Sequence, residues 1–194
     1  DIGGMSPGSM AGGMKDIYQE GLRIPVVKLF REGKLDQDIF DILLLNVRVR
    51  EERRGDYNAQ FSALHLAARR LFEMINKYSG DLIRNVFNEI IDRTYERMLS
   101  AITLIPDGVY RFEDVMDDDG REAVNVPINL TATIKGKSAL FDFAGTSPQT
   151  PGNINIPLHG TKAAVCYVLK AMLDPEIPNN QGVLDAVEVV APMG

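Results

Sequence analysis

The spacing of apolar positions divides the chain into a helical part and a sheet part. Apolar side chains recur every three or four residues through 61–78 and again through 82–102, which is the period of helices that bury one face. A helix over residues 36–50 is expected before them, with Asp36 as its N-cap. Gly55 is expected to separate this first helix from the second. Because a single Ser-Gly step joins the two long helices, the pattern predicts an antiparallel helical hairpin.

From residue 106 the period changes to two. Apolar and polar side chains alternate through 128–134, as expected for a strand with one buried face. Turn residues at Asp119, Gly120 and Gly136 divide this part into a three-stranded antiparallel meander. The expected segments are strands near 109–115, 123–134 and 138–143, a loop over 145–157, a helix over 161–173, a turn over 175–182 and a strand over 186–190.

The chain as a whole is therefore predicted to be α+β, with a helical hairpin lobe followed by an antiparallel β-meander with a further helix and strand. The expected regions are a glycine-rich loop and extended segment over 1–34, a helical region over 35–105, and an antiparallel sheet with a helix over 106–194. All three regions are expected to belong to one larger domain.

Composition and charge narrow the class of partner. The chain has 194 residues, of which 45% are hydrophobic, so it can bury a sizeable core. Its formal net charge of -6 disfavours nucleic acid, because phosphate backbones would be repelled. The longest apolar run, residues 39–45, is too short to span a bilayer, so no membrane partner is expected. The only cysteine, Cys166, lies in an apolar run and is expected to be a buried hydrophobe, which fits a reducing cytoplasm.

Local catalytic signatures are missing from the sequence, which has no P-loop, HExxH, GxSxG or dinucleotide GxGxxG motif. An ATP site must therefore lie elsewhere. His65 and His159 have no second ligand at metal-binding spacing, and packing roles are favoured for both. The acidic run over residues 117–119 is interpreted as a solvated hairpin turn, because the later ligands of a calcium-binding loop are absent.

Two loops are rich in groups that could contact a ligand. Residues 1–13 are dominated by glycine, methionine and serine, which lets the backbone approach a ligand or another chain closely. A nucleophilic serine is not expected there, because the sequence places no base within reach. Hydroxyls and amides crowd the loop over 145–157, where a pocket and a structural turn are equally supported.

Ordered motifs along the chain resemble those of one family. They are Asp1-Ile-Gly-Gly-Met-Ser-Pro-Gly-Ser-Met, then Ile17-Tyr-Gln-Glu-Gly-Leu-Arg-Ile-Pro25, Asn46-Val-Arg48, Ile105-Pro-Asp-Gly-Val-Tyr110, Asp142-Phe-Ala-Gly-Thr-Ser-Pro-Gln149 and Pro178-Asn-Asn-Gln-Gly182. In wording and order these motifs resemble the hydantoinase B/oxoprolinase proteins, and the resemblance covers essentially the whole chain. The chain is similar to an internal piece of such a protein, and a piece of this kind is expected to be inactive alone.

The resemblance implies an enzyme that works with an actin-like, ATP-binding partner subunit or domain. Members of the family include N-methylhydantoinase, 5-oxoprolinase, and acetone and acetophenone carboxylases. Phosphorylation of a cyclic amide oxygen in the partner would make the amide carbon easier for water to attack. A divalent metal ion would supply hydroxide near neutral pH. The intact protein is accordingly expected to be a cytoplasmic hetero-oligomer, with neither ATP nor metal held by these residues alone.

The same resemblance suggests which residues lie near the site. The family's metal-binding histidine pair comes just before the motif that begins at Asp1. Asp1 is therefore expected beside the metal, orienting a ligating histidine rather than binding the ion. The residues expected to line or shape the substrate side are Gly3, Gly4, Ser6, Gly8, Ser9, Glu20 and Arg23, with Thr146, Ser147, Asn153 and Asn155 as further candidates.

Three functions are compatible with these observations. The leading hypothesis is part of the metal-site subunit of an ATP-dependent cyclic amide hydrolase acting on hydantoin- or 5-oxoproline-like rings. A subunit of an ATP-dependent ketone carboxylase is the chemical alternative, and a dry, small site would favour it. A non-catalytic assembly module, binding the ATPase partner without touching substrate, is the third.

Overall fold

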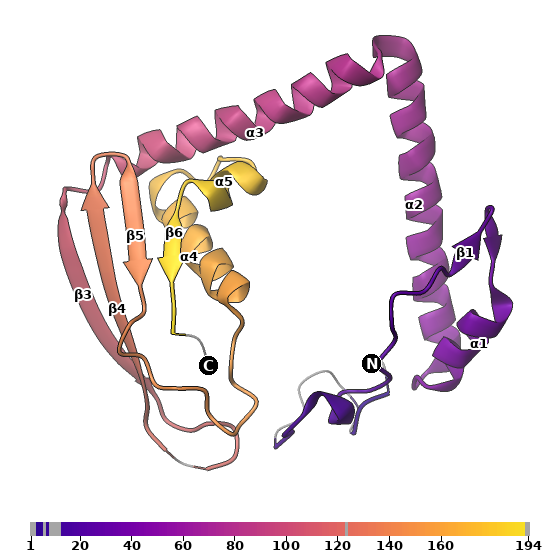
Figure 1. Ribbon diagram of the computed structural model, residues 1–194, viewed down its shortest axis with the longest axis horizontal. Helices are drawn as coiled ribbons and strands as arrows, with labels where there is room; N and C mark the ends of the chain where they lie inside the picture. The colour runs from indigo at the N-terminus through magenta and orange to yellow at the C-terminus, as the bar shows by residue number, and fades with distance from the viewer. Residues whose placement is uncertain (1–2, 6, 8–12, 123, 193–194) are drawn as a thin grey trace. The chain divides into compact units, whose positions relative to one another are not determined.

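The computed structural model describes residues 3–5, 7, 13–122 and 124–192. It divides into two compact units, Asp1–Lys77 and Tyr78–Gly194. Figure 1 labels most of the helices and strands of both units.

The first unit is built from short elements followed by one long helix. They are the 3-10 helix η1 (Ile17–Gln19), β1 (Phe30–Arg31), β2 (Lys34–Leu35), α1 (Gln37–Leu45) and α2 (Arg50–Tyr78), whose final residue belongs to the second unit. The expected N-cap is confirmed, since the Asp36 carboxylate accepts from the Ile39 N–H at 3.3 Å. The antiparallel pair of β1 and β2 was not predicted, because two residues are too few to show a period.

The expected break at Gly55 is wrong. Helix α2 runs through this glycine, and the interruption lies earlier, between α1 and α2. There the Asn46 side chain donates to the carbonyl oxygen of Ile42 at 2.7 Å, and Val49 has a φ of 48°. Ion pairs one turn apart span the glycine region, including Arg53 with Asp56 at 2.7 Å. Such pairs support a helix, so one glycine of low propensity does not end it.

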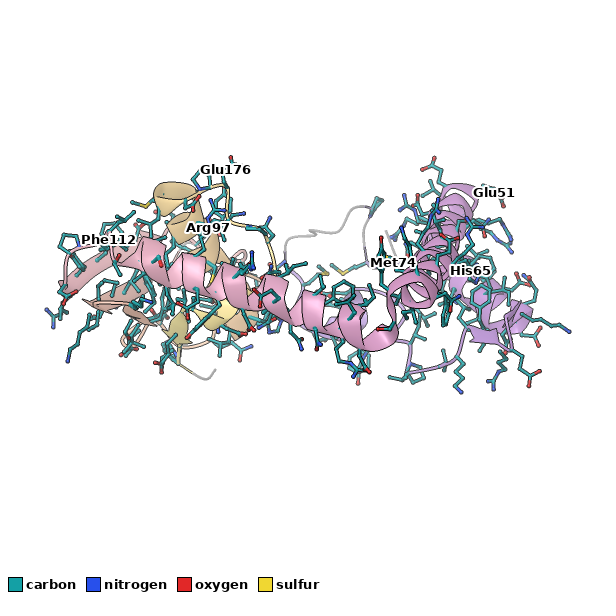
Figure 2. All side chains as sticks on the ribbon, turned by 90° about the horizontal axis from the view of Figure 1, so that it is seen from above. Glu51, His65, Met74, Arg97, Phe112 and Glu176 are labelled. Atoms are coloured by element: carbon teal, nitrogen blue, oxygen red, sulfur yellow. The ribbon has the colours of Figure 1, made fainter. Side chains whose placement is uncertain are left out.

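Aromatic contacts form the core of the first unit. Phe40 is 2% exposed, and its ring centroid lies 5.7 Å from that of Phe61. Phe61 also contacts Phe30 and Tyr57, at centroid distances of 5.0 and 6.4 Å. His65, which projects from α2 (Figure 2), lies edge-on to Phe30 at 5.4 Å. The predicted packing role of His65 is therefore a contact with an aromatic ring at an exposed position.

The second unit places helices against a mixed sheet. Its elements are α3 (Gly80–Ile102), β3 (Gly108–Met116), β4 (Val126–Lys135), β5 (Ser138–Asp142), α4 (Leu158–Leu173), α5 (Gln181–Asp185) and β6 (Glu188–Val190). The strand order is β3-β4-β5-β6, as Figure 1 shows. The predicted α+β class and the antiparallel meander of β3, β4 and β5 are confirmed.

The end of the sheet differs from the prediction. Strand β6 runs parallel to β5, because the intervening helices carry the chain back before it re-enters the sheet. Residues 181–185, expected to lie in and after a turn, form α5, whose first turn is capped by the Asn180 side chain on the Gly182 N–H at 2.9 Å. A Cβ atom at Gly182 would lie 2.4 Å from the carbonyl oxygen of Ile91, so α5 packs closely on α3.

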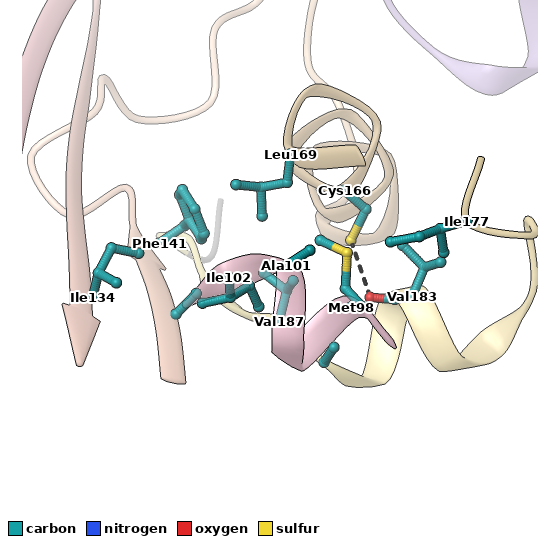
Figure 3. Close-up of a cluster of buried hydrophobic side chains, with 12 residues drawn as sticks. Met98, Ala101, Ile102, Ile134, Phe141, Cys166, Leu169, Ile177, Val183 and Val187 are labelled. Carbon is teal, nitrogen blue, oxygen red and sulfur yellow. Dashed lines mark hydrogen bonds between the residues drawn. The ribbon is translucent and has the colours of Figure 1, made fainter. Parts of the chain in front are cut away.

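One continuous apolar core holds the second unit together (Figure 3). Its buried members come from α3, both central strands, α4, α5 and the adjoining turn: Met98, Ala101, Ile102, Ile134, Ala139, Phe141, Cys166, Leu169, Ile177, Val183, Ala186 and Val187. The prediction for Cys166 is confirmed, because this residue is 4% exposed and its thiol donates to the carbonyl oxygen of Val183. Burial raises the pKa of the thiol, which disfavours the reactive thiolate.

The step between the two long helices is a single residue, Ser79. It has a φ of 74°, in the region that favours glycine, and its hydroxyl accepts from the Leu82 N–H at 3.3 Å to begin α3. Because the division between the units falls here, the hairpin stays a prediction. Across the described residues, no helix combines the length and apolar character needed to cross a membrane.

Candidate functional site: the anchored start of the glycine-rich loop

The described start of the glycine-rich loop is held on two sides. Gly3 forms an antiparallel bridge with Gly21, and the Met5 N–H donates to the Gln19 carbonyl oxygen at 2.8 Å. From the other side, the half-buried Arg48 guanidinium donates to the carbonyl oxygen of Gly4 at 2.7 Å. The backbone that enters the loop is therefore fixed by three contacts.

Close backbone approach explains why glycine occupies two successive positions. Gly3 has a φ of +89°, and a Cβ atom there would lie 1.9 Å from the carbonyl oxygen of Asn46. A Cβ atom at Gly4 would lie 2.7 Å from the carbonyl oxygen of Glu20. Since real Cβ atoms do not approach oxygen so closely, neither position accepts a side chain without movement of the backbone.

The turn that receives this segment is itself capped. The Asp16 carboxylate accepts from the Tyr18 N–H at 3.0 Å, and the Gln19 side-chain oxygen accepts from the Asp16 N–H at 3.3 Å. The Asp16 side chain also accepts from the Gln19 N–H, and this contact and the one from the Asp16 N–H to Gln19 form a capping box. The exposed Arg23 guanidinium lies over the Tyr18 ring, 4.9 Å from its centroid. Among the predicted site residues, Gly3, Gly4 and Glu20 are thus brought together, and Arg23 lies in the irregular segment that follows Gly21.

Four predicted residues, Asp1, Ser6, Gly8 and Ser9, lie outside the described residues, and their roles stay predictions. Two anchoring groups were missed as site residues. The Arg48 side chain and the Gln19 backbone reach the loop over 44 and 14 residues of sequence. The run Asn46-Val-Arg48 was the only available signal for the first.

The second predicted group lies in the other unit and fastens a loop to the sheet. The Thr146 hydroxyl accepts from the Asn129 N–H at 3.0 Å and donates to the Asn129 carbonyl at 3.1 Å. Asn129 also donates from its side chain to the Gly145 carbonyl at 2.6 Å, and the Ser147 N–H donates to Pro127 at 2.9 Å. The Thr146 side chain therefore supports the loop beside β4.

The amide of Asn155 closes the same loop on itself. Its nitrogen donates to the carbonyl oxygens of Thr150 and Gly152, at 2.8 and 2.9 Å, while its oxygen accepts from the Thr150 N–H at 2.9 Å. Asn153 lies against a second loop, where a Cβ atom at Gly120 would meet the Asn153 side-chain oxygen at 2.8 Å. These contacts hold the backbone of the loop in place.

The acidic run lies in the connection between β3 and β4, where a hairpin turn was predicted, and Asp117 and Asp118 are exposed. The interpretation as a solvated turn is wrong for Asp119. This residue is 4% exposed, and a Cβ atom at Gly152 would lie 1.6 Å from its carbonyl oxygen. The Asp119 carboxylate accepts from the N–H groups of Arg121 and Glu122 at 2.9 and 2.8 Å. The backbone hydrogen bond from Glu122, above all, lowers the pKa of Asp119. Asp119 thus organises the junction of two loops.

The possible metal ligands of the described residues do not cluster into a binding site. Within those parts of the chain, no group of three or more His, Cys, Asp or Glu side chains is placed to hold a metal ion. His159, on the first turn of α4, is exposed, and His65 lies in the other unit.

Comparisons with known proteins agree with the ordered motifs. A family model described as Hydantoinase B/oxoprolinase matches residues 1–194. A putative D-/L-hydantoinase component from Pseudomonas sp. (strain NS671) is 33% identical over 206 residues, covering 100% of this chain and 35% of the relative. The crystal structure of ATP-dependent caprolactamase from Pseudomonas jessenii matches with a TM-score of 0.86 and 32% identity, covering 100% of this chain and 33% of that one.

A third match is to a solved structure whose sequence identity to this chain is lower. The nucleotide-free structure of acetone carboxylase has a TM-score of 0.86 at 18% identity, covering 97% of this chain and 26% of that one. At that identity the likeness concerns the fold alone. The chain spans about a third of the length of the hydantoinase and caprolactamase chains that it matches.

Proposed function

The chain belongs to the hydantoinase B/oxoprolinase family, and from this premise we propose that it is part of the metal-site subunit of an ATP-dependent cyclic amide hydrolase. The proposed substrates are hydantoin- and 5-oxoproline-like rings. The observation that carries the proposal is identity of about one third, along the whole chain, to a hydantoinase component and to an ATP-dependent caprolactamase. Both relatives are named for cyclic amides.

The glycine-rich loop is the part of this chain that we propose lies against the ring. Its entry is fixed by Gly21, Gln19 and Arg48, so the following backbone starts from a defined position. A binding loop that is held in place before the substrate arrives loses less conformational entropy on binding. Ser6, Gly8 and Ser9 would then shape the substrate side, with Glu20 and Arg23 in the adjoining segment.

The loop over residues 145–157 is a secondary part of the proposed substrate side. Thr146 and Asn155 hold its backbone, while Ser147 and Asn153 are its further polar candidates. Because the supporting side chains are already hydrogen-bonded, their role in the proposal is to position the loop rather than to bind substrate directly.

The cofactors and partners belong to the proposal for the whole protein. A divalent metal ion would supply hydroxide near neutral pH, with Asp1 orienting one of its ligands. ATP would be bound by an actin-like partner subunit or domain that phosphorylates the amide oxygen. The resulting assembly is proposed to be a cytoplasmic hetero-oligomer.

The proposal is tested by ATP turnover of the whole protein mixed with its candidate partner subunit. The substrates would be hydantoins, 5-oxoproline, lactams, and small ketones supplied with bicarbonate. ATP hydrolysis that depends on a cyclic amide and yields the opened product is expected. Turnover that instead requires a ketone and bicarbonate would overturn the hydrolase assignment in favour of a carboxylase, whose fold is shared.

The role of the loop is tested separately with Gly4→Ala. The new methyl group cannot fit against the Glu20 carbonyl, so the loop should shift and kcat/KM should fall roughly ten- to a hundredfold, as expected when a binding group is displaced by about 1 Å. Gly55→Ala is the matched control, because a Cβ atom there meets nothing within 4 Å. Unchanged turnover by Gly4→Ala would favour a non-catalytic assembly module. The same conclusion would follow if Gly4→Ala weakened the complex with its partner while the complex that still forms turned over at the normal rate.

A further inference from the structure

Among the residues that the structure describes, no strand pairs with the outer edge of β3 in the second unit. All nine residues of Gly108–Met116 pair with β4 on one side, and β3 is the outermost strand in Figure 1. Residues 109–116 are all exposed. A long edge strand of this kind is a template for pairing with another strand.

Hydrogen bonds identify which backbone groups point out from this edge. Val115 lies opposite Pro127, but its N–H donates to the Asp114 carboxylate at 2.8 Å. The Pro127 carbonyl accepts from the Ser147 N–H on its other side. The Val115 and Pro127 pair is therefore not hydrogen-bonded. Since bonded and non-bonded pairs alternate in an antiparallel ladder, Val109, Arg111, Glu113 and Val115 direct their N–H and C=O groups toward the open edge.

The sequence of this edge is complementary to its own reverse. In an antiparallel pair of two β3 strands centred on Phe112, Arg111 of each copy lies opposite Glu113 of the other. Val109 lies opposite Val115 in the same register, and the two Phe112 residues face each other. Opposite charges and apolar pairs across strands stabilise a sheet. We propose that β3 pairs antiparallel with β3 of a second copy of this chain, on a two-fold axis at Phe112.

The apolar surface beside the axis fits the same partner. Phe112 lies opposite Leu130 in the sheet and so shares the face on which Leu130 packs against the core, yet Phe112 is 66% exposed. It projects outward in Figure 2. Pairing of two copies brings these rings together and continues the apolar face from one sheet to the next. A C2 interface of this kind uses the same patch on both subunits.

The charges of Arg111 and Glu113 favour a second copy of this chain over an unrelated strand as the partner of β3. A partner strand must present a negative group opposite Arg111 and a positive group opposite Glu113, and a second β3 supplies both at once. Natural edge strands usually carry proline, lysine or a bulge that prevents such pairing, and the sequence from Gly108 to Met116 contains neither proline nor lysine. The Asp114 carboxylate covers one N–H group, which leaves most of the edge available.

The test uses charge reversal in the whole protein, with sedimentation velocity as the readout of mass. Arg111→Glu and Glu113→Arg each place like charges opposite one another twice per dimer and should weaken self-association by roughly tenfold. The double variant, R111E with E113R, restores both pairs and should restore the dimer. Arg93→Glu is the control, since Arg93 is an exposed arginine on α3 whose side chain is 79% exposed.

Disulfide capture tests the register itself. The two Phe112 residues form a non-hydrogen-bonded pair, whose Cα atoms lie about 4.5 Å apart, within the range for a disulfide. Phe112→Cys should therefore give a covalent dimer on mild oxidation. Asp114→Cys should not, because position 114 meets position 110 of the second copy. Cys166 is buried and contributes no background.

Failure of this pairing is recognised without reference to catalysis. Charge reversals that leave the mass of the whole protein unchanged, or a double variant that stays dissociated, would overturn the proposal. Equal cross-linking at positions 112 and 114 would overturn the register. Either result would mean that another segment or another protein covers the edge, and neither depends on which substrate the enzyme turns over.

Discussion

Two long helices illustrate how differently the two units are held together. Helix α2 has 29 residues, and none of them is buried, whereas five residues of α3 are buried, among them Met98 and Ile102 at 0% exposure. The second unit gathers its buried side chains into one continuous core. The first unit relies on an aromatic cluster, ion pairs along α2 and the polar contacts around Gly3 and Gly4.

This difference indicates that the more stable part of the molecule and the proposed binding loop lie in different units. Apolar burial is the largest favourable contribution to folding, so the second unit should be the more stable part. The anchored loop belongs to the unit with the smaller core, and binding segments are commonly found in regions of lower local stability. Its precision comes instead from backbone contacts such as that of Arg48 with Gly4.

The largest expected effect follows removal of a core side chain. Met98→Ala should lower the free energy of unfolding of the second unit by about 2–5 kcal/mol, because the cavity cannot be refilled by neighbouring core atoms. Met74→Ala on α2 is the matched control, since Met74 is 40% exposed. Native-state hydrogen exchange resolves the two units. Comparable losses from both variants would contradict the proposed difference.

A smaller effect is expected from the aromatic cluster of the first unit. Phe61→Ala removes contacts with Phe30, Phe40 and Tyr57 and should lower stability by roughly 1–3 kcal/mol, since the ring is only half-buried and each aromatic pair adds modestly to burial. Phe72→Ala is the control, because Phe72 is 65% exposed. Urea unfolding followed by hydrogen exchange of the first unit gives the measurement. Equal urea midpoints for Phe61→Ala and Phe72→Ala would show that the aromatic cluster stabilises the first unit no more than an exposed ring does.

Much of the fold was predictable, because helices and strands with one buried face leave a period in the sequence. The residue where a helix breaks was not. Gly55 looks like a stop signal by propensity, whereas Asn46 caps the preceding helix through its side chain. The parallel direction of β6 also depends on packing, since α5 reaches its place through contacts such as Asn180 with Thr94 at 2.8 Å.

The candidate site was predictable only in part. A glycine-rich composition indicates a loop, and Gly3 and Gly4 are two of its glycines that pack closely against other backbone. The reason that glycine is needed lies elsewhere in the chain, in carbonyl oxygens of Asn46 and Glu20. No pattern in the local sequence predicts contacts between residues that are so far apart in the chain. Asp119 was misinterpreted for the same reason, because the backbone that packs against it, at Gly152, lies far along the sequence.

Gly55 allows a test of how much one glycine destabilises the polar, exposed helix α2. Its φ is not in the left-handed region and a Cβ atom meets nothing within 4 Å, so Gly55→Ala should raise stability by about 0.5–1 kcal/mol. Gly33→Ala is the matched contrast in the same unit. The space there is equally open, but the φ of +77° is unfavourable for alanine, so stability should fall. Thermal unfolding of both variants decides, and a rise in both would refute the conformational argument.

The smallest expected effect concerns the ion pair that ties α3 to the end of α4. Arg97 donates to both carboxylate oxygens of Asp174, at 2.6 and 2.8 Å, and these hydrogen bonds lower the pKa of Asp174. A carboxyl group whose pKa is lower in the folded state stabilises the fold above its unfolded pKa, and this contribution disappears as the pH falls through the folded pKa. Solvent screens an exposed pair, so the contribution is modest.

Asp174→Asn should therefore lower stability slightly at neutral pH and make the loss of stability below about pH 4 less steep. The Asp92→Asn variant is the control, because Asp92 is an exposed aspartate on the same helix as Arg97. Urea midpoints measured between neutral and acid pH give the comparison. Parallel pH profiles for wild type and Asp174→Asn would show that the pair does not stabilise the fold, leaving the core alone to hold α3 against α4.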